Sequence, residues 1–519
     1  MQLRKCLTTS VAAAVLAGFA GATYASAQTV VTMNTPEVFG SLDPAKISDA
    51  GDYMAVVNLY DALLTVMPGG SIAPELAESW DVNEDATEFT FKIRADATFT
   101  DGSPVEASDV IYSYERLVRL NQGPANLFTD VVKSVEAVDD KTVKFTLVKT
   151  FAPFLATVPS LFILNEEVAV ANEGGDDSQT WLSTNAAGGG AYVLKEPPSG
   201  AGMVIARDKD YYGGFNDRPI DEVRWIVTAD EATVRALAAS GELTMASPFL
   251  APETYDALEK MGRFTRTDTS TATSFMLKLN TQVPPTDDVH IRRAIALATD
   301  YDTIREVIYP GDKLVGPLPP AFADYIPDDL HAPVFDMEAA AAEVAKSKYA
   351  GAPIPITLGY VAGLKFEEEI SLLMQSNLEK LGFEVTQQAD PWNRIVELAA
   401  TPETTPAVNQ VFFGPTYPSP DSMFFTQYHS SSAGSWASME WVDNPEIDAL
   451  IDKARSSADP EVQRAAYQEL QRRLVDMQSD VFLLTLSFQL VMDKCLTGYE
   501  FVPMQSVPYD FTRYSWQCD

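Results

Sequence analysis

The sequence predicts an α/β protein of two or three domains in which helices pack against sheets. Two observations indicate this class: the length of the chain, and the alternation of strand-like and helix-like stretches without a repeat or a low-complexity tract. A chain of 519 residues exceeds the usual size of one hydrophobic core. Alternating elements are typical of a sheet that is covered by helices.

The N-terminal stretch has the pattern of a removable export signal. Arg4 and Lys5 form a basic start, and the stretch 7–22 is uncharged, apolar and rich in small residues. Ala25-Ser26-Ala27 then gives the small-x-small pattern of a cleavage site. No later segment approaches the roughly 20 apolar residues that a membrane helix needs. We therefore expect a signal peptide over 1–27 and a soluble, periplasmic mature protein.

The chain carries a large excess of carboxylates, with a formal net charge of −36 at pH 7. A field of this sign repels polyanions, so nucleic acid is excluded as a partner. The excess could favour a cationic ligand, but we interpret it as a solubilising acidic surface.

Two cysteines remain after removal of the signal peptide, Cys495 and Cys518. An oxidising compartment favours a disulfide between them, which would fasten the C-terminal tail. No neighbouring residue supports a catalytic or metal-binding role for two free thiols.

Two kinds of periodicity predict the strands and the helix near the start of the mature chain. Apolar and polar residues alternate over 89–93 and again over 143–147, which predicts two half-buried strands. Between them, apolar residues recur at helical spacing from Glu106 to Leu120, which predicts an amphipathic helix. A compact mixed subdomain is expected.

Elements near the C-terminus follow from a cap and an apolar run. Asp459 and Pro460 provide an N-cap and a first-turn proline, so a helix is expected from there to about Met477. The run 481–486 is short and uncharged, as in a strand that is buried on both faces. Prolines and glycines separate the elements without forming a long linker, so the domains should pack together and share strands.

An ordered series of short segments runs through the whole mature chain. It comprises Leu42-Asp43-Pro44-Ala45, Ile72 to Trp80, Phe89 to Arg94, Phe99 to Pro104, Asp109-Val110, Gly188 to Tyr192, Arg207 to Gly214, Ser240-Gly241-Glu242, Leu279-Asn280-Thr281, Asp288 to Ala294 and Asn444 to Asp448. This series resembles the family 5 extracellular solute-binding proteins, a periplasmic group that serves importers of peptides, nickel, opines and some oligosaccharides. Ala191, Thr244 and Ser479 depart from the family pattern and look like scaffold variation.

The resemblance implies a two-lobed periplasmic binding protein fold of type II, similar to cluster C, with an inserted α+β subdomain. The implied ranges are 28–58, 188–279 and 487–519 for lobe one, 59–187 for the inserted subdomain and 280–486 for lobe two. Two inter-lobe crossings near 279 and 487 would form the hinge. Most of the matched residues are architectural, so the resemblance identifies the scaffold rather than the cargo.

The resemblance also implies the function of an ABC importer component that is not an enzyme and needs no cofactor. Such a protein is expected to act as a monomer, to capture a small solute by lobe closure and to deliver it to the permease subunits. An oligopeptide or peptide-like compound is the leading solute class, and an oligosaccharide or an opine-type ligand is the alternative.

Cargo in this family is recognised largely by lobe two, through a segment that corresponds to 411–421. Peptide-binding relatives have an aspartate where this chain has Thr416, whose hydroxyl supplies no full charge to a ligand ammonium group. Asp421 could substitute for it or could cap the next helix. Aromatic rings suit a peptide side chain or a sugar face. The candidate ligand-binding residues are Thr416, Asp421, Phe413, Tyr417, Trp392 and Trp436. For Phe413 and Trp392, core packing is an equal alternative.

The sequence contains no motif that is typical of a metal site or of a hydrolase. The histidines are His290, His331 and His429, and no two of them have a ligand spacing, so no metal site is expected. The chain contains neither Gly-x-Ser-x-Gly nor His-Glu-x-x-His. An exported glycoside hydrolase with a carboxylate pair is the remote alternative.

Overall fold

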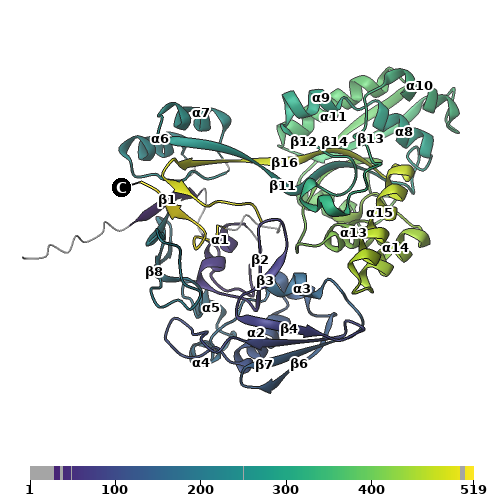
Figure 1. Cartoon of the computed structure of the whole chain (residues 1–519). Coiled ribbons are helices and arrows are strands. Elements are labelled where there is room, and N and C mark those ends of the chain that lie inside the picture. The colour runs from purple at the N-terminus through teal and green to yellow at the C-terminus, as the bar shows by residue number, and fades with distance from the viewer. Residues whose placement is uncertain are drawn as a thin grey trace, which may run out of the picture.

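The computed structural model describes residues 29–518 except 36–38, 48–49, 229, 249 and 503–508. The signal peptide predicted for 1–27 lies outside the described residues. Figure 1 shows two large units that are joined at the top by a pair of long strands, and a smaller unit below the first. We call them lobe one, lobe two and the inserted subdomain, and define each by its sheet. The exact domain boundaries stay a prediction.

Lobe one is built on a four-stranded sheet in the order β1-β10-β9-β8. β1 is parallel to β10, and the other neighbours are antiparallel. Its strands and helices are β1 (Val30–Thr35), β8 (Tyr192–Ser199), β9 (Gly202–Arg207), β10 (Glu222–Val227), α1 (Ala50–Leu59), α6 (Glu231–Ser240) and α7 (Pro252–Lys260). The C-terminal tail returns to this lobe with β17 (Leu496–Thr497) and β18 (Ser515–Trp516). Asn58 of α1 holds the tail by bonding the backbones of Tyr509 and Phe511.

The inserted subdomain contains an antiparallel sheet in the order β4-β5-β7-β6. Its elements are β2 (Leu64–Val66), β3 (Ile72–Pro74), β4 (Ala77–Val82), β5 (Glu88–Ile93), β6 (Val132–Asp139), β7 (Thr142–Leu147), α2 (Ala107–Leu120), α3 (Phe154–Thr157), α4 (Glu166–Ala171) and α5 (Gln179–Leu182). β5, β7 and α2 confirm the strands and the helix predicted from periodicity. Glu106 is the N-cap of α2, and Asp109 in the first turn accepts the backbone N–H of Glu106 at 2.9 Å.

Lobe two contains a six-stranded sheet in the order β12-β16-β11-β15-β13-β14. Its strands are β11 (Phe264–Leu279), β12 (Gly311–Lys313), β13 (Ile354–Val361), β14 (Phe383–Asp390), β15 (Val408–Phe413) and β16 (Asp480–Asp493). Its helices are α8 (Val289–Leu297), α9 (Tyr301–Thr303), the short 3-10 helix η4 (Pro320–Tyr325), α10 (Met337–Lys346), α11 (Lys365–Glu379), α12 (Trp392–Leu398), α13 (Pro420–Tyr428), α14 (Pro445–Arg455) and α15 (Pro460–Met477). α15 begins after the predicted N-cap, Asp459, and ends at the predicted residue. Within the described part of the chain, no helix has the length and apolar character that a bilayer crossing requires.

β11 and β16 connect the two lobes as one antiparallel pair (Figure 1). At one end, Phe264 and Val491 pack with α6 and α7 of lobe one. At the other end, Lys278 pairs with Asp480 inside the sheet of lobe two. The register is irregular between Ser270 and Ser274, midway along the pair. The predicted crossings near 279 and 487 fall on this pair, at the end of β11 and at the partner of Ser270.

Cys495 and Cys518 form a disulfide with a Cα–Cα distance of 5.1 Å, which is usual for such bonds. The bond fastens β18 and the end of the tail beside β17.

Removing this disulfide should lower the thermal stability of the protein. The two cysteines are 23 residues apart in sequence, and the chain-entropy model gives about 3 kcal/mol for a loop of this length. We expect a lower unfolding midpoint for the C495S/C518S variant in differential scanning calorimetry. Dithiothreitol should lower the midpoint of the wild type only. Equal midpoints for wild type and variant would contradict this prediction.

Candidate functional site

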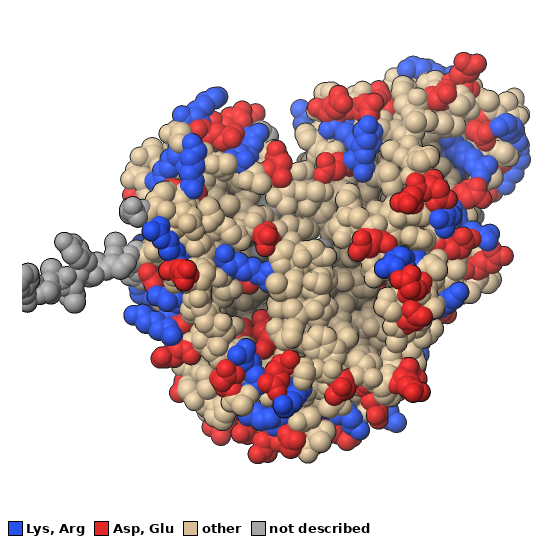
Figure 2. Space-filling view, in the orientation of Figure 1, with Lys and Arg blue, Asp and Glu red and all other residues tan. Residues whose placement is uncertain are grey.

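A cavity of about 560 Å³ lies between lobe two and the inserted subdomain. One wall consists of the β2–β3 turn and the residues around α3, and the other of η4 and the loop before α13. Asp324 is the charged residue among those that line it, and the polar ones are Ser71, Tyr325, Ser419 and Gln463. Figure 2 shows that the charged side chains of this face lie mostly around its rim, whereas its middle is largely uncharged.

The loop at one wall of this cavity follows the carboxyl end of a parallel strand. β13 is parallel to β14 on one side and to β15 on the other, so the carboxyl ends of all three strands meet at one edge. α11 covers the face of Ile356 and Leu358, and α12 covers the opposite face, with Val361 and Val411. The strand order therefore reverses at β13. In open α/β sheets, ligands bind at such a reversal, outside the carboxyl ends of the strands.

Three of the predicted aromatic residues form a row along this edge. Phe413 ends β15 and is 3% exposed, and its ring centroid lies 5.9 Å from that of Trp436. The ring of Trp436 lies 5.3 Å from that of Trp392. Trp392 is 42% exposed. The row thus runs from the core at Phe413 to the surface at Trp392, which is the member with the largest area open to a solute.

In the loop after β15, the polar side chains predicted to bind the solute bond other side chains of the protein. The backbone N–H and the hydroxyl of Thr416 both bond the hydroxyl of Ser422. Tyr417 is 7% exposed, packs within the core cluster of the inserted subdomain, and donates its hydroxyl to Asp421 at 2.6 Å. Asp421 is fully buried. Burial raises the pKa of its carboxyl, and Arg455 opposes the rise.

Solute contact by Thr416, Asp421 and the four aromatic residues stays a prediction. None of the six is among the residues that line the 560 Å³ cavity, to which the predicted segment contributes only Pro418, Ser419 and Pro420. The structure groups Phe413, Trp436 and Trp392, and it groups Tyr417 with Asp421. The wall from the inserted subdomain, which includes 152–156, was not predicted. That stretch has no periodicity or unusual composition, so the sequence carries no signal for its role.

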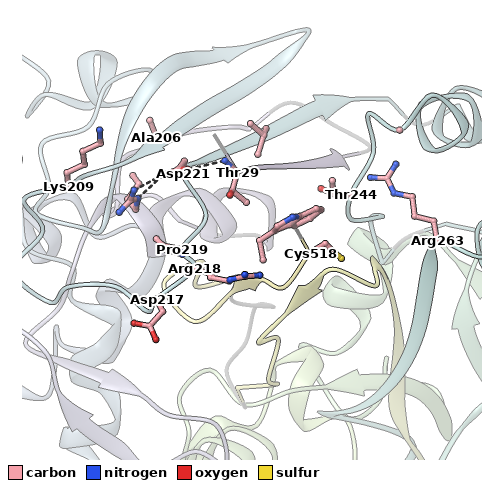
Figure 3. Close-up of a pocket in the computed structure, with 14 residues that line it drawn as sticks. Thr29, Ala206, Lys209, Asp217, Arg218, Pro219, Asp221, Thr244, Arg263 and Cys518 are labelled. Atoms are coloured by element: carbon pink, nitrogen blue, oxygen red, sulfur yellow. Dashed lines mark hydrogen bonds and ion pairs between the residues drawn. The ribbon is translucent and has the colours of Figure 1, made fainter. Parts of the chain in front are cut away.

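A larger cavity, of about 1060 Å³, lies in lobe one beside the C-terminal tail (Figure 3). Its lining includes the cations Arg207 and Arg263, but each of them is paired, with Asp221 and Asp493 respectively. Its lining residues come from β1, β9, the tail and neighbouring loops, and none belongs to lobe two. A solute bound there would contact one lobe only, so we take the cavity between lobe two and the inserted subdomain as the candidate site.

The described residues include no group of three or more histidine, cysteine, aspartate or glutamate side chains that could hold a metal ion. His290 instead bonds Glu343 at 2.7 Å, and His429 bonds Ser431. What the candidate site offers is therefore a cavity with polar and aromatic walls.

Comparison with known proteins gives consistent matches over nearly the whole chain. Residues 71–435 match the family described as "Bacterial extracellular solute-binding proteins, family 5 Middle". The probable D,D-dipeptide-binding periplasmic protein of Escherichia coli K12 is 28% identical over 473 residues, 89% of this chain and 90% of that protein. Di/tripeptide-binding protein 2 of Pseudomonas aeruginosa is 28% identical over 93% of this chain and 94% of its own length.

Solved structures match the fold at lower identity. The structure of HbpA2 from Haemophilus parasuis has a TM-score of 0.82 at 21% identity, and the match covers 94% of this chain and all of that one. A periplasmic murein tripeptide-binding protein in its unliganded open form has a TM-score of 0.79 at 20% identity, with 95% and 98% covered. These likenesses show the same two-lobed α/β architecture.

Proposed function

The chain belongs to family 5 of the bacterial extracellular solute-binding proteins, which serve ABC importers and are not enzymes, and we propose that its solute is a small peptide or peptide-like compound. The predicted two-lobed binding-protein fold is confirmed. In the proposed function the protein binds this solute in the periplasm, between lobe two and the inserted subdomain, and delivers it to the permease subunits of its importer.

The observation that carries this function is the arrangement of two lobes on one strand pair with a cavity between lobe two and the inserted subdomain. A solute that contacts both walls favours the arrangements in which the walls are close. Micromolar affinity requires about −8 kcal/mol, which a few hydrogen bonds and aromatic contacts can supply. No bond of the solute has to break.

The peptide class rests on the relatives and on the walls of the cavity. The two relatives described above carry dipeptide and di/tripeptide binding in their names. Polar groups such as Ser419 and Gln463 suit a peptide backbone, and uncharged surface such as Ala152 and Pro153 suits apolar side chains. Because Thr416 supplies no charge, any ammonium group of the solute would need another acceptor.

An oligosaccharide or an opine-type ligand is the second candidate. Trp392 does not line the cavity, but its exposed ring, with Trp436 at 5.3 Å, could stack on the sugar face or the peptide side chain of a solute that extends beyond the cavity. The structure therefore offers a specific reason to test sugars beside peptides.

Native mass spectrometry of protein purified from its host periplasm would identify a retained solute. We expect an intact peptide or peptide-like molecule under about 1 kDa, in keeping with pocket volumes of several hundred Å³. Calorimetric titration with di- to pentapeptides, their N-acetylated forms and oligosaccharides would then rank the classes. Binding of oligosaccharides alone would overturn the peptide class, and turnover of any of these compounds would overturn simple binding.

Replacing Trp392 with alanine should weaken solute binding without unfolding lobe two. Loss of one exposed aromatic contact is expected to weaken affinity about two- to tenfold, on the scale of about 0.5–1.5 kcal/mol for aromatic contacts. Val396 lies one turn further along α12 and is 39% exposed, so V396A is the matched control. Titration with the solute found by mass spectrometry checks both variants, and equal affinities for W392A and V396A would refute the role of Trp392.

A further inference from the structure

Arg455 is the last residue of α14 and lies where lobe two meets the inserted subdomain. Its carbonyl accepts the backbone N–H of Ala152 at 2.8 Å. Its guanidinium carbon lies 3.5 Å from the ring centroid of Phe425 in lobe two and 5.1 Å from that of Phe151 in the inserted subdomain. One residue thus contacts both sides, through its backbone and through a cation–π arrangement with two rings.

The same guanidinium faces the loop that precedes α13. Its Nε lies 3.6 Å from Oδ1 of Asp421, which is an ion pair without a hydrogen bond. Asp421 in turn accepts the hydroxyl of Tyr417, whose ring packs in the core cluster of the inserted subdomain. Arg455 and Tyr417 therefore form two neighbouring contacts between lobe two and the inserted subdomain, and Asp421 lies between them.

These contacts border the candidate site on both walls. Ala152 and Pro153 line the cavity from the inserted subdomain, directly after Phe151. Pro418, Ser419 and Pro420 line it from lobe two, between Tyr417 and Asp421. The contacts of Arg455 and Tyr417 thus lie next to residues of both walls.

We infer that Arg455 is a positioning residue that joins lobe two to the inserted subdomain and thereby sets the width of the solute cavity. The inference rests on the proposed function, because it takes this cavity as the solute site. If the attraction at Arg455 is removed, the two bodies can separate at this point, and a solute that needs both walls loses contacts on one of them. Arg455 acts on the solute through the position of the walls and need not contact it.

The test measures the distance between the two bodies in the full-length mature protein. Val138 of the inserted subdomain is 61% exposed and Val334 of lobe two is 63% exposed, so spin labels on V138C and V334C should leave the fold intact. Double electron–electron resonance is recorded for this labelled protein and for its R455A and R455K forms. R473A is the matched control, because Arg473 is an exposed arginine of lobe two that pairs within that lobe, with Glu469 of its own helix and Glu446 of α14.

Without ligand, R455A should raise the ratio of long to short distances about tenfold, the change that corresponds to losing about 1.4 kcal/mol of attraction. R455K keeps the charge but not the planar group over the rings, so a smaller shift in the same direction is expected. R473A should give the wild-type distribution. A folded R455A with the wild-type distribution would overturn the inference, and if R455A does not fold, an unchanged R455K would do so.

Titration with trialanine separates the inference from the function on which it rests. If trialanine binds the wild type, R455A should bind it more weakly while R473A binds it equally well. Equal binding by R455A would show that Arg455 does not set the width of the solute site. If trialanine binds neither protein, that peptide is not the solute, and the distance distributions still decide whether Arg455 joins the two bodies.

Discussion

Replacing Asp43 with alanine should cost about 3–5 kcal/mol of the free energy of unfolding, because it leaves the charge of Arg116 buried and unpaired. The two side chains have no exposed surface and meet in a bidentate pair, at 2.8 Å and 2.6 Å. Arg116 also donates to the carbonyl of Asp177 at 2.8 Å. The pair fixes α2 of the inserted subdomain to the segment between β1 and α1 in lobe one. Urea denaturation followed by circular dichroism measures the loss.

Two comparisons separate the buried charge from the loss of a side chain. The double variant D43L/R116M should lose less stability than D43A, because apolar side chains of similar size can replace a buried ion pair. Asp96 pairs with Arg94 at the surface, so D96A should cost less than about 1 kcal/mol. If D43A is as stable as D96A, the pair does not hold the two parts together.

Replacing Lys278 with methionine should destabilise lobe two by a similar amount, about 3–5 kcal/mol. Its ammonium group lies 2.9 Å from Glu440 and 3.5 Å from Asp480, and none of the three side chains is exposed. It also lies 5.1 Å from the ring centroid of Tyr428. Without the cation, the carboxyl groups of Glu440 and Asp480 remain in the core, where β11 enters lobe two, without their positive partner. A lower urea midpoint for K278M would be expected, and a midpoint equal to that of the wild type would refute this account.

A substitution of Glu440 provides the control for K278M. Lys278 carries one positive charge and faces two buried acidic side chains, so it cannot neutralise both of them. Burial, opposed by Lys278 and reinforced by Asp480, raises the pKa of Glu440 to about 8. At neutral pH the folded protein thus keeps a proton on this carboxyl, which glutamine imitates. E440Q should therefore be far less damaging than K278M at pH 7.

Because Glu440 holds this proton more tightly in the folded state, the stability that it gives the protein should fall as the pH rises. Between its ordinary pKa, near 4.5, and about 8, Glu440 is protonated in the folded state and ionised in the unfolded state. The folded state binds more protons, so the stability contributed by this group falls as the pH rises through that window. Urea midpoints at pH 5 and pH 8 should fall more steeply for the wild type than for E440Q. Parallel slopes would contradict the raised pKa.

Much of the fold could be predicted because its signals are local. β5, β7 and α2 follow from side-chain periodicity, and α15 follows from the cap at Asp459. Local signals predicted only part of β16. The apolar run 481–486 predicts its first half, but the strand continues to Asp493 because 487–493 pair with 264–270 of β11. Pairing between residues more than 200 positions apart leaves no pattern in either segment.

The candidate site was predicted less completely, and Tyr417 shows why. Its neighbours are prolines and a glycine, which indicate a loop but do not say what covers that loop. The inserted subdomain, far earlier in the chain, packs against Tyr417, and Asp421 is buried beside Arg455. Trp392 begins α12, from which Ile395 and the C-cap Ala399 pack against the sheet, and its own side chain stays 42% exposed.

The sequence by itself determined the family, the order of the elements and the residues that cap and pattern them, because these depend on neighbours along the chain. It also marked Asp43 as part of a specific segment, but its partner Arg116 lies 73 residues away. Only the tertiary structure decided which charges are buried together, which aromatic rings face solvent and which surfaces enclose the cavity. These properties depend on contacts between distant segments, and local sequence patterns do not encode them.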